Sequence, residues 1–196
     1  MSQNFQKQKS KQLARKDKSN EGRWDKAIIP LCNKINRKPE YYTTSSCAGR
    51  ITLVKALDEK ARGVFLFKSH NKINFSQLKK ELSEAVKKYD GLIYLKQEPC
   101  ILHVACKDFK AGEDLLKKAR EAGWKRSGII STRKRVMLEL MSTEKMELPI
   151  ADKKILVSDE FLKLLVREVN KKLSRVREKI KTKPKKTYFL NMQTSC

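Results

Sequence analysis

The chain has 196 residues, of which 39% are hydrophobic, so it can bury one sizeable core without metal or disulfide staples. Its formal charge of +24 exceeds what solubility requires and indicates a polyanionic partner, with nucleic acid the leading candidate and an acidic membrane surface the rival. No stretch approaches the roughly 18 consecutive apolar residues of a membrane-spanning helix, and the N-terminus carries no apolar signal core. We therefore expect a cytoplasmic monomer that does not associate with membranes.

The cysteines argue for a reducing compartment. They are odd in number and form no CxxC pair, which is atypical of a secreted disulfide framework; they are Cys32, Cys47, Cys100, Cys106 and Cys196. His103 lies between Cys100 and Cys106, a spacing that could suggest a metal site. On a strand, however, His103 would point to the face opposite both cysteines, so we expect no metal.

The first predicted element is a basic segment over residues 1–20. Phe5, Lys9 and Leu13 recur at roughly helical spacing, while the lysine- and glutamine-rich composition is also typical of a disordered arm that becomes ordered on RNA. Apolar residues at helical spacing then predict a helix over residues 21–36, with a kink at Pro30.

A hydroxyl-rich segment follows at residues 41–50, which read Tyr-Tyr-Thr-Thr-Ser-Ser-Cys-Ala-Gly-Arg. Short hydroxyl and thiol groups, a glycine that permits close backbone approach and the donor fork of Arg50 suit a cradle for a charged small molecule or nucleotide. A plain β-turn rich in turn formers explains the same residues. Both interpretations stay open on residue types alone.

Hydrophobic periodicity, turn residues and capping residues predict the remaining elements. Strands are expected at 51–57, 64–67, 92–95, 101–106, 127–130 and 136–141, helices at 75–89 and from Asp108 to Gly123, and an extended run into a loop at 147–150. Ser158 should cap a long C-terminal helix. Its apolar positions thin beyond Asn170, so we expect its end to leave the core as a basic projection.

The fold class that follows is α+β. We expect a single domain with a mixed sheet of about six strands, flanking helices and a long basic C-terminal helix. A Rossmann-type methyltransferase or dinucleotide fold is excluded, because the GxGxxG pattern is missing and strands outnumber the available crossover helices. The expected division is a basic arm or helix at 1–20, a catalytic domain at 21–180 and a basic, disordered tail at 181–196.

The order of motifs resembles the tRNA wybutosine-synthesising protein 3 family. The resemblance spans nearly the whole chain to about residue 180 and is carried by Phe5, Lys9, Leu13 and Asp17-Lys18-Ser19, the run from Tyr42 to Ile51, Ser69-His70, Glu98 to Val104, Gly123 to Ile129, Ser142-Thr143, Glu147-Leu148-Pro149 and Asn170-Lys171-Lys172. Two segments depart from the family pattern: Glu144-Lys145 stand where histidine and glycine are common, and the basic turn at 133–135 lacks glycine.

The resemblance implies an enzyme that transfers a methyl group from S-adenosylmethionine to N4 of a tricyclic guanine derivative beside the anticodon of phenylalanine tRNA. The expected donor-binding residues are Ser45, Ser46, Cys47, Gly49, Arg50, Ser127 and Gly128. The expected catalytic residues are His103, His70 and Ser46, since a near-neutral imidazole can accept the proton that leaves the methylated nitrogen. A buried histidine held for stability alone is the competing interpretation of His103.

Basic residues at both ends of the chain and in one turn are expected to grip tRNA phosphates, with binding that weakens steeply with salt. They are Lys9, Arg15, Lys16, Arg133, Lys134, Arg135, Lys171, Lys172 and Arg175. Trp124, Tyr41 and Tyr42 could stack on an unpaired base, although Trp124 suits a core position equally well. The alternative function from another class is a non-catalytic basic RNA-binding protein, in which the hydroxyl-rich run is only a structural turn.

Overall fold

Five helices and nine strands form within the residues that the computed structural model describes, 2–14, 25–56 and 63–181. The helices are α1 (Ser2–Leu13), α2 (Ile29–Asn36), α3 (Phe75–Lys88), α4 (Phe109–Glu121) and α5 (Asp159–Lys181). The strands are β1 (Tyr41–Cys47), β2 (Arg50–Lys55), β3 (Phe65–Ser69), β4 (Leu92–Glu98), β5 (Ile101–Cys106), β6 (Gly128–Ser131), β7 (Val136–Met141), β8 (Met146–Asp152) and β9 (Lys154–Ile155).

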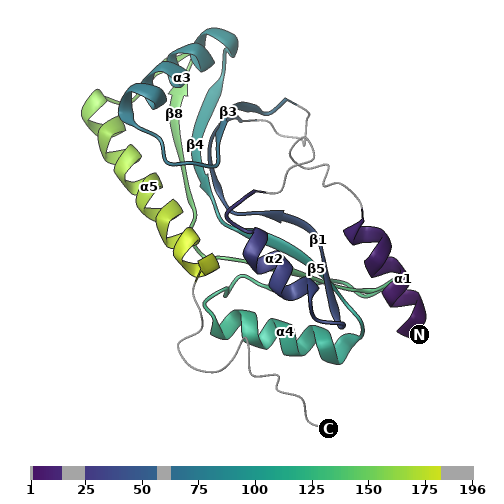
Figure 1. Cartoon of the computed structure of the whole chain (residues 1–196). Helices are drawn as coiled ribbons and strands as arrows, with labels where there is room; N and C mark the ends of the chain where they lie inside the picture. The colour runs from purple at the N-terminus through teal and green to yellow at the C-terminus, as the bar shows by residue number, and fades with distance from the viewer. Residues whose placement is uncertain (1, 15–24, 57–62, 182–196) are drawn as a thin grey trace. The chain divides into compact units, whose positions relative to one another are not determined.

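The chain crosses between two compact units several times. Unit 1 comprises residues 1–48, 100–143 and 177–196, and unit 2 comprises residues 49–99 and 144–176. Helix α5 begins in unit 2, and its last turn belongs to unit 1. Figure 1 shows the elements of each unit.

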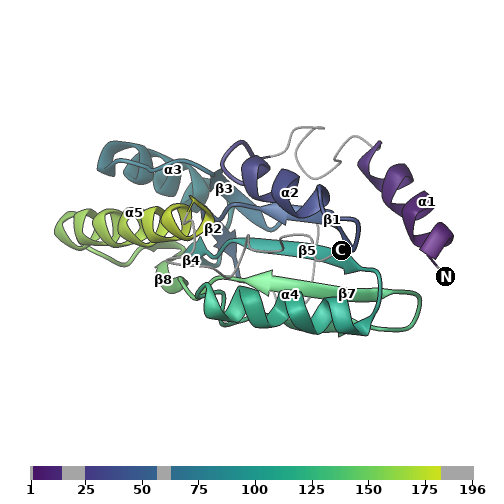
Figure 2. The same ribbon diagram turned by 60° about the horizontal axis from the view of Figure 1, so that its bottom comes forward.

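Unit 1 is built on an antiparallel sheet with the strand order β1-β5-β7-β6. Helix α2 packs on β1, and α4 packs on β5, β6 and β7 (Figure 2). Alternate residues of β5 and β7 point to this helical face and are buried, among them Leu102, Val104 and Leu138. Gly112 lets α4 approach closely, because a Cβ at this position would lie 2.9 Å from Cγ1 of Val136.

The opposite face of this sheet is covered at one end by α1. Phe5 packs against Tyr42, with ring centroids 5.1 Å apart, and both belong to a cluster that includes Ala105 and Met137. Of the two alternatives for the N-terminal segment, residues Ser2–Leu13 form a helix, and the Phe5–Tyr42 contact packs this helix on the sheet. Residues further along this face are left half-exposed.

Unit 2 contains the second antiparallel sheet, in the order β3-β2-β4-β8-β9. Leu78 and Leu82 of α3 and Leu162 and Val169 of α5 are buried in one core. Leu95 of the sheet packs in the same core. Asn170 joins α5 to the segment before α3, because its side chain accepts from the Ile73 amide at 3.0 Å and donates to the Ile73 carbonyl at 2.7 Å.

The predicted α+β class is confirmed, but the predicted mixed sheet of about six strands is wrong. Every strand pairing in the described part of the chain is antiparallel, and the strands form two sheets. Gly49, with φ of 83°, separates β1 from β2, so the hydroxyl-rich run supplies a strand to one sheet and the start of a strand to the other. The expected loop at 147–150 is part of β8, which pairs with β4.

The predicted starts of α3, α4 and α5 are more accurate than the predicted sheet, because each capping residue lies next in sequence to the helix that it caps. Asn74, Asp108 and Ser158 each accept a hydrogen bond from a backbone N–H in the first turn of α3, α4 and α5. Pro30 does not kink α2, since the helix begins at Ile29 and the proline occupies its first turn, where no amide donor is needed.

The expected basic projection at the end of α5 is also wrong. Leu173, Val176 and Ile180 remain buried, so the apolar stripe continues to the last turn. No helix among the described residues has the length and apolar character that crossing a membrane requires. The proposed domain boundaries stay a prediction, and the tail from residue 182 lies outside the described residues.

Candidate functional site

A hydrogen-bonded chain of three side chains crosses the unit 1 sheet on its half-exposed face. Oγ of Ser45 lies 2.8 Å from Nδ1 of His103, and Nε2 of His103 lies 2.9 Å from Oε2 of Glu139. The three residues come from β1, β5 and β7 and are direct neighbours in the strand register. Side chains opposite one another on adjacent strands are close enough to touch, so the register itself assembles this chain.

A bulge in β1 determines which serine forms the hydrogen bond with His103. The register shifts between Thr43 and Ser45, which places Ser45 opposite His103 and Ser46 opposite Leu102. Leu102 is buried on the helical face, so Ser46 alternates away from the imidazole. Of the two predicted serines, it is Ser45 whose hydroxyl contacts His103.

The two contacts define a proton path through the imidazole. A carboxylate can only accept, so the bond to Glu139 places a hydrogen on Nε2, and Nδ1 of the neutral ring then accepts from the Ser45 hydroxyl. The side chains of His103 and Glu139 are 31% and 32% exposed, which leaves the path accessible from solvent. This arrangement can take a proton at Ser45 and compensate the resulting imidazolium with a carboxylate.

Apolar residues and a glycine flank Ser45, His103 and Glu139 on the same face. Cys47, Ile101 and Met141 are opposite one another in register and half-buried, and they form an apolar row next to the polar one. Gly128 on β6 is opposite Glu139, and a Cβ placed there would have no neighbour within 4 Å. The expected residue Gly128 therefore lies at the open end of the polar row.

A basic pocket borders the same face on the side of α1. It has a volume of about 890 Å³ and is lined by Gln8, Ser131, Met137 and the three cations of the β6–β7 turn, Arg133, Lys134 and Arg135. Arg135 donates to the Tyr42 hydroxyl at 2.9 Å, which holds its guanidinium over the tyrosine ring. A turn with three adjacent cations attracts phosphate groups.

Other predicted donor-binding residues have partners of their own. Ser127 donates to the Trp124 carbonyl at 2.6 Å and accepts from the Met141 amide at 3.1 Å, which accounts for its buried hydroxyl structurally. In unit 2, Arg50 pairs with Glu98 and lies over the Phe65 ring, 4.6 Å from its centroid. The roles assigned to both residues stay predictions.

The predicted catalytic residue His70 follows β3 in unit 2, with both ring nitrogens buried. It belongs to unit 2, whereas His103 belongs to unit 1, and its catalytic role stays a prediction. Gly49 opens the turn before β2 through its positive φ.

The predicted phosphate contacts are distributed over both units. Lys171, Lys172 and Arg175 lie on α5 within unit 2, whereas Lys9 lies on α1 and donates to the Lys38 carbonyl. Arg15 and Lys16 are outside the described residues. Of the predicted set, the three cations of the β6–β7 turn lie together at one pocket.

Burial sets the chemistry of two thiols. It raises the pKa of the Cys106 thiol to about 12, with a smaller effect from Asp108, and it also raises the pKa of Cys100. Both are therefore protonated near neutral pH and unsuited to nucleophilic or metal-binding roles. Among the described residues, no group of three or more histidine, cysteine or acidic side chains could hold a metal ion.

Residues 3–186 match the protein family described as Methyltransferase TYW3. A protein of Methanocaldococcus jannaschii named tRNA(Phe) 7-((3-amino-3-carboxypropyl)-4-demethylwyosine(37)-N(4))-methyltransferase is 38% identical over 163 residues, which are 81% of this chain and 83% of that protein. The human tRNA wybutosine-synthesizing protein 3 homolog is 31% identical over 183 residues, covering 90% of this chain and 69% of that protein.

The fold is shared as well. A solved structure of the PH1069 protein from Pyrococcus horikoshii is similar with a TM-score of 0.80 and 32% identity, and the match covers 92% of each chain. A solved structure of a hypothetical protein from Aeropyrum pernix is similar with a TM-score of 0.70 and 30% identity, covering 80% of this chain and 92% of that one. The similarity therefore concerns both units.

Proposed function

Because the chain belongs to the Methyltransferase TYW3 family, we propose that it transfers a methyl group from S-adenosylmethionine to N4 of a 4-demethylwyosine-type base beside the anticodon of phenylalanine tRNA. Family membership confirms the predicted resemblance and the predicted methyltransferase activity, and it disfavours the alternative of a non-catalytic RNA-binding protein. A methyltransferase requires a methyl donor. The observation that carries the proposed mechanism is the chain from Ser45 through His103 to Glu139.

The open face of the unit 1 sheet offers groups that fit such a donor. S-adenosylmethionine has a sulfonium and an ammonium against one carboxylate, so the Glu139 carboxylate is a favourable neighbour. Its adenine matches the apolar row of Cys47, Ile101 and Met141. We therefore assign donor binding to these residues, with Gly128 leaving room beside them.

When bound, S-adenosylmethionine supplies a methyl carbon that the base nitrogen attacks as the carbon–sulfur bond breaks. The protein's tasks are then to orient the base and to remove the proton from N4. Both ring nitrogens of His103 already have partners, so Ser45 is the group that faces the base. Its oxygen accepts the N4 proton while its own proton moves to Nδ1 of His103, and Glu139 stabilises the imidazolium.

The basic pocket beside this face also suits a tRNA substrate. Its three cations, Arg133, Lys134 and Arg135, can bind the phosphates that flank the reacting nucleotide. The reacting base must leave its stack in the anticodon loop before a protein can reach it. Phosphate contacts at this pocket would hold the backbone while the base enters the site.

The direct test is a methyl-transfer assay with isotopically labelled donor. The full chain is incubated with phenylalanine tRNA carrying the 4-demethylwyosine-type base, and the digested tRNA is analysed by mass spectrometry. The expected product carries one labelled methyl group on that nucleoside. The matched control is the same tRNA with unmodified guanosine, which lacks the tricyclic acceptor. No labelled product, or equal labelling of the control, would contradict the proposed function.

A further inference from the structure

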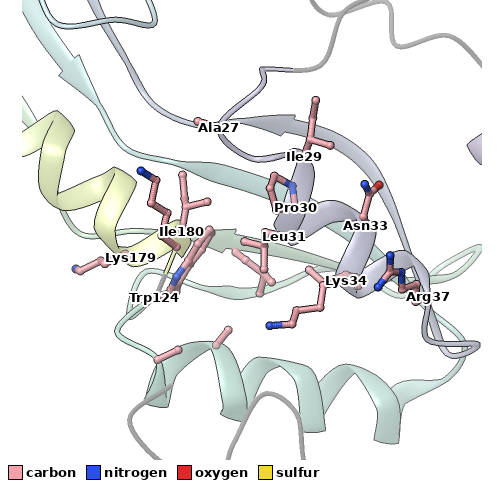
Figure 3. A pocket seen from close by; sticks show the side chains of 15 residues that line it. Ala27, Ile29, Pro30, Leu31, Asn33, Lys34, Arg37, Trp124, Lys179 and Ile180 are labelled. Atoms are coloured by element: carbon pink, nitrogen blue, oxygen red, sulfur yellow. The ribbon is translucent and has the colours of Figure 1, made fainter. Parts of the chain in front are cut away.

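A second pocket lies in unit 1, lined by residues of α2, the end of α4, Trp124 and the last turn of α5 (Figure 3). Its volume is about 570 Å³, within the range of small-molecule sites, roughly 300–1,000 Å³. Neither the relay of Ser45, His103 and Glu139 nor the basic β6–β7 turn contributes to it.

The lining combines an apolar wall with positive charge. Ile35, Leu140 and Ile180 belong to the wall together with the largely buried Trp124. Four cations also line the pocket, Lys34, Arg37, Lys179 and Lys181, and none of its lining residues is acidic. A planar apolar group with an attached phosphate matches this combination.

The pocket is separate from the relay because the sheet lies between them. Leu140 lines the pocket and Glu139 belongs to the relay, and consecutive residues of a strand point to opposite faces. A group bound in the pocket is therefore not the base that reacts beside Ser45. Nor does the pocket suit the methyl donor, since S-adenosylmethionine has a net positive charge and would meet four cations without a carboxylate.

We propose that this pocket binds a second nucleotide of the tRNA substrate, with its base against the apolar wall and its phosphate between Lys34 and Arg37. The inference rests on the proposed function, because it takes tRNA as the substrate. It adds a contact point on the face of the unit 1 sheet away from the reaction. The pocket would then raise affinity for tRNA without taking part in methyl transfer.

Titration of the full chain with adenosine 5′-monophosphate tests the proposal, using calorimetry and the fluorescence of Trp124. Trp24, the only other tryptophan, is replaced by phenylalanine so that the signal has one source. We expect the monophosphate to change the fluorescence and to bind about tenfold more tightly than adenosine, because a phosphate forms charge-assisted hydrogen bonds. S-adenosylhomocysteine should not displace it.

The variant Lys34→Glu places a negative charge in the pocket, and Lys117→Glu makes the same charge change at an exposed position of α4 that does not line it. Lys34→Glu should weaken monophosphate binding about tenfold or more and raise KM for tRNA with kcat unchanged. Lys117→Glu should do neither. Equal effects of the two variants, no monophosphate binding, or displacement by S-adenosylhomocysteine would overturn the proposal.

The two proposals can fail separately. If the wild-type protein methylates tRNA and the monophosphate does not bind, the pocket assignment falls and the methyltransferase stands. If the monophosphate binds as expected and no methyl group is transferred, the proposed function falls instead.

Discussion

Nε2 of His103 lies 2.9 Å from Oε2 of Glu139, on the adjacent strand of an antiparallel sheet. The carboxylate fixes which ring nitrogen carries the hydrogen, and so leaves Nδ1 to accept from Ser45 at 2.8 Å. Glu139, 36 positions away in the sequence, thereby favours one tautomer of the His103 imidazole. A half-exposed pair of this kind gives little stability.

The first prediction concerns the charge on Glu139. Glu139→Gln keeps the shape of the side chain but removes the charge that stabilises an imidazolium, so kcat should fall by about 100-fold, the lower end of the range of acid–base contributions. KM for tRNA should change little, because Glu139 is expected to contact no phosphate. Steady-state methylation over a series of tRNA concentrations measures both quantities.

Glu121→Gln is the matched control, since Glu121 is exposed at the end of α4. It should methylate at the parental rate. Equal activity of Glu139→Gln and Glu121→Gln would remove Glu139 from the mechanism.

Neighbouring serines provide the second prediction. Ser45→Ala removes the hydroxyl that contacts Nδ1 of His103, and single-turnover methyl transfer should slow by about 100-fold or more. Ser46→Ala should have a small effect, because Ser46 alternates to the other face of β1. A larger loss in Ser46→Ala than in Ser45→Ala would mean that the bulge does not define the catalytic serine.

Local signals in the sequence predicted α3 and α4 well, whereas the helix expected over residues 21–36 begins only at Ile29. The caps at Asn74 and Asp108 and the positive φ of Gly123 after α4 lie where residue type and spacing placed them. The two sheets were not predictable in this way, because strand pairing depends on contacts between distant segments. Gly49 was read as part of a binding loop, whereas it also divides one run of extended chain between two sheets.

The candidate site was predicted in part. His103 and Ser45 were singled out by residue type, and Ser45 does contact His103. Glu139 was missed, although it is the only charged residue in the apolar strand β7, a signal that a buried or half-buried partner exists. Its register opposite His103 could not be read from the sequence alone.

The third prediction concerns thiol reactivity. Because burial raises the pKa of Cys100 and Cys106, little thiolate forms on either at about pH 8, where an ordinary cysteine with a pKa near 8.5 ionises appreciably. A maleimide should therefore label half-buried Cys47 in the folded protein and spare these two until the protein is unfolded. Peptide mapping after labelling identifies the modified positions.

The same shift predicts how stability depends on pH. The folded protein retains the Cys106 proton up to about pH 12, whereas the unfolded chain loses it near the ordinary thiol value, so the free energy of unfolding should fall as pH rises between these values. Cys106→Ala should reduce this alkaline loss, as measured by denaturant unfolding at a series of pH values. An unchanged slope, or labelling of Cys106 as fast as Cys47 without unfolding, would contradict the burial assigned to it.

The fourth prediction concerns the basic β6–β7 turn. Lys134→Ala removes an exposed cation from the pocket, so tRNA binding should weaken and the slope of log K against log salt should decrease by about 0.7–0.9 if one phosphate contact is lost. Lys110→Ala on α4 changes the same charge away from the pocket and should leave the slope nearly unchanged. Filter binding across a range of salt concentrations measures both. Identical slopes for the two variants would show that this turn does not contact phosphate.

Single-turnover methyl transfer by His103→Gln tests the proposed mechanism most directly. The variant keeps a polar side chain of similar length, and circular dichroism and thermal unfolding establish that it is folded. If the imidazole between Ser45 and Glu139 receives the departing proton, the rate falls by about 100- to 10,000-fold while binding of S-adenosylhomocysteine is retained. Methylation at the parental rate by the folded variant would contradict this mechanism.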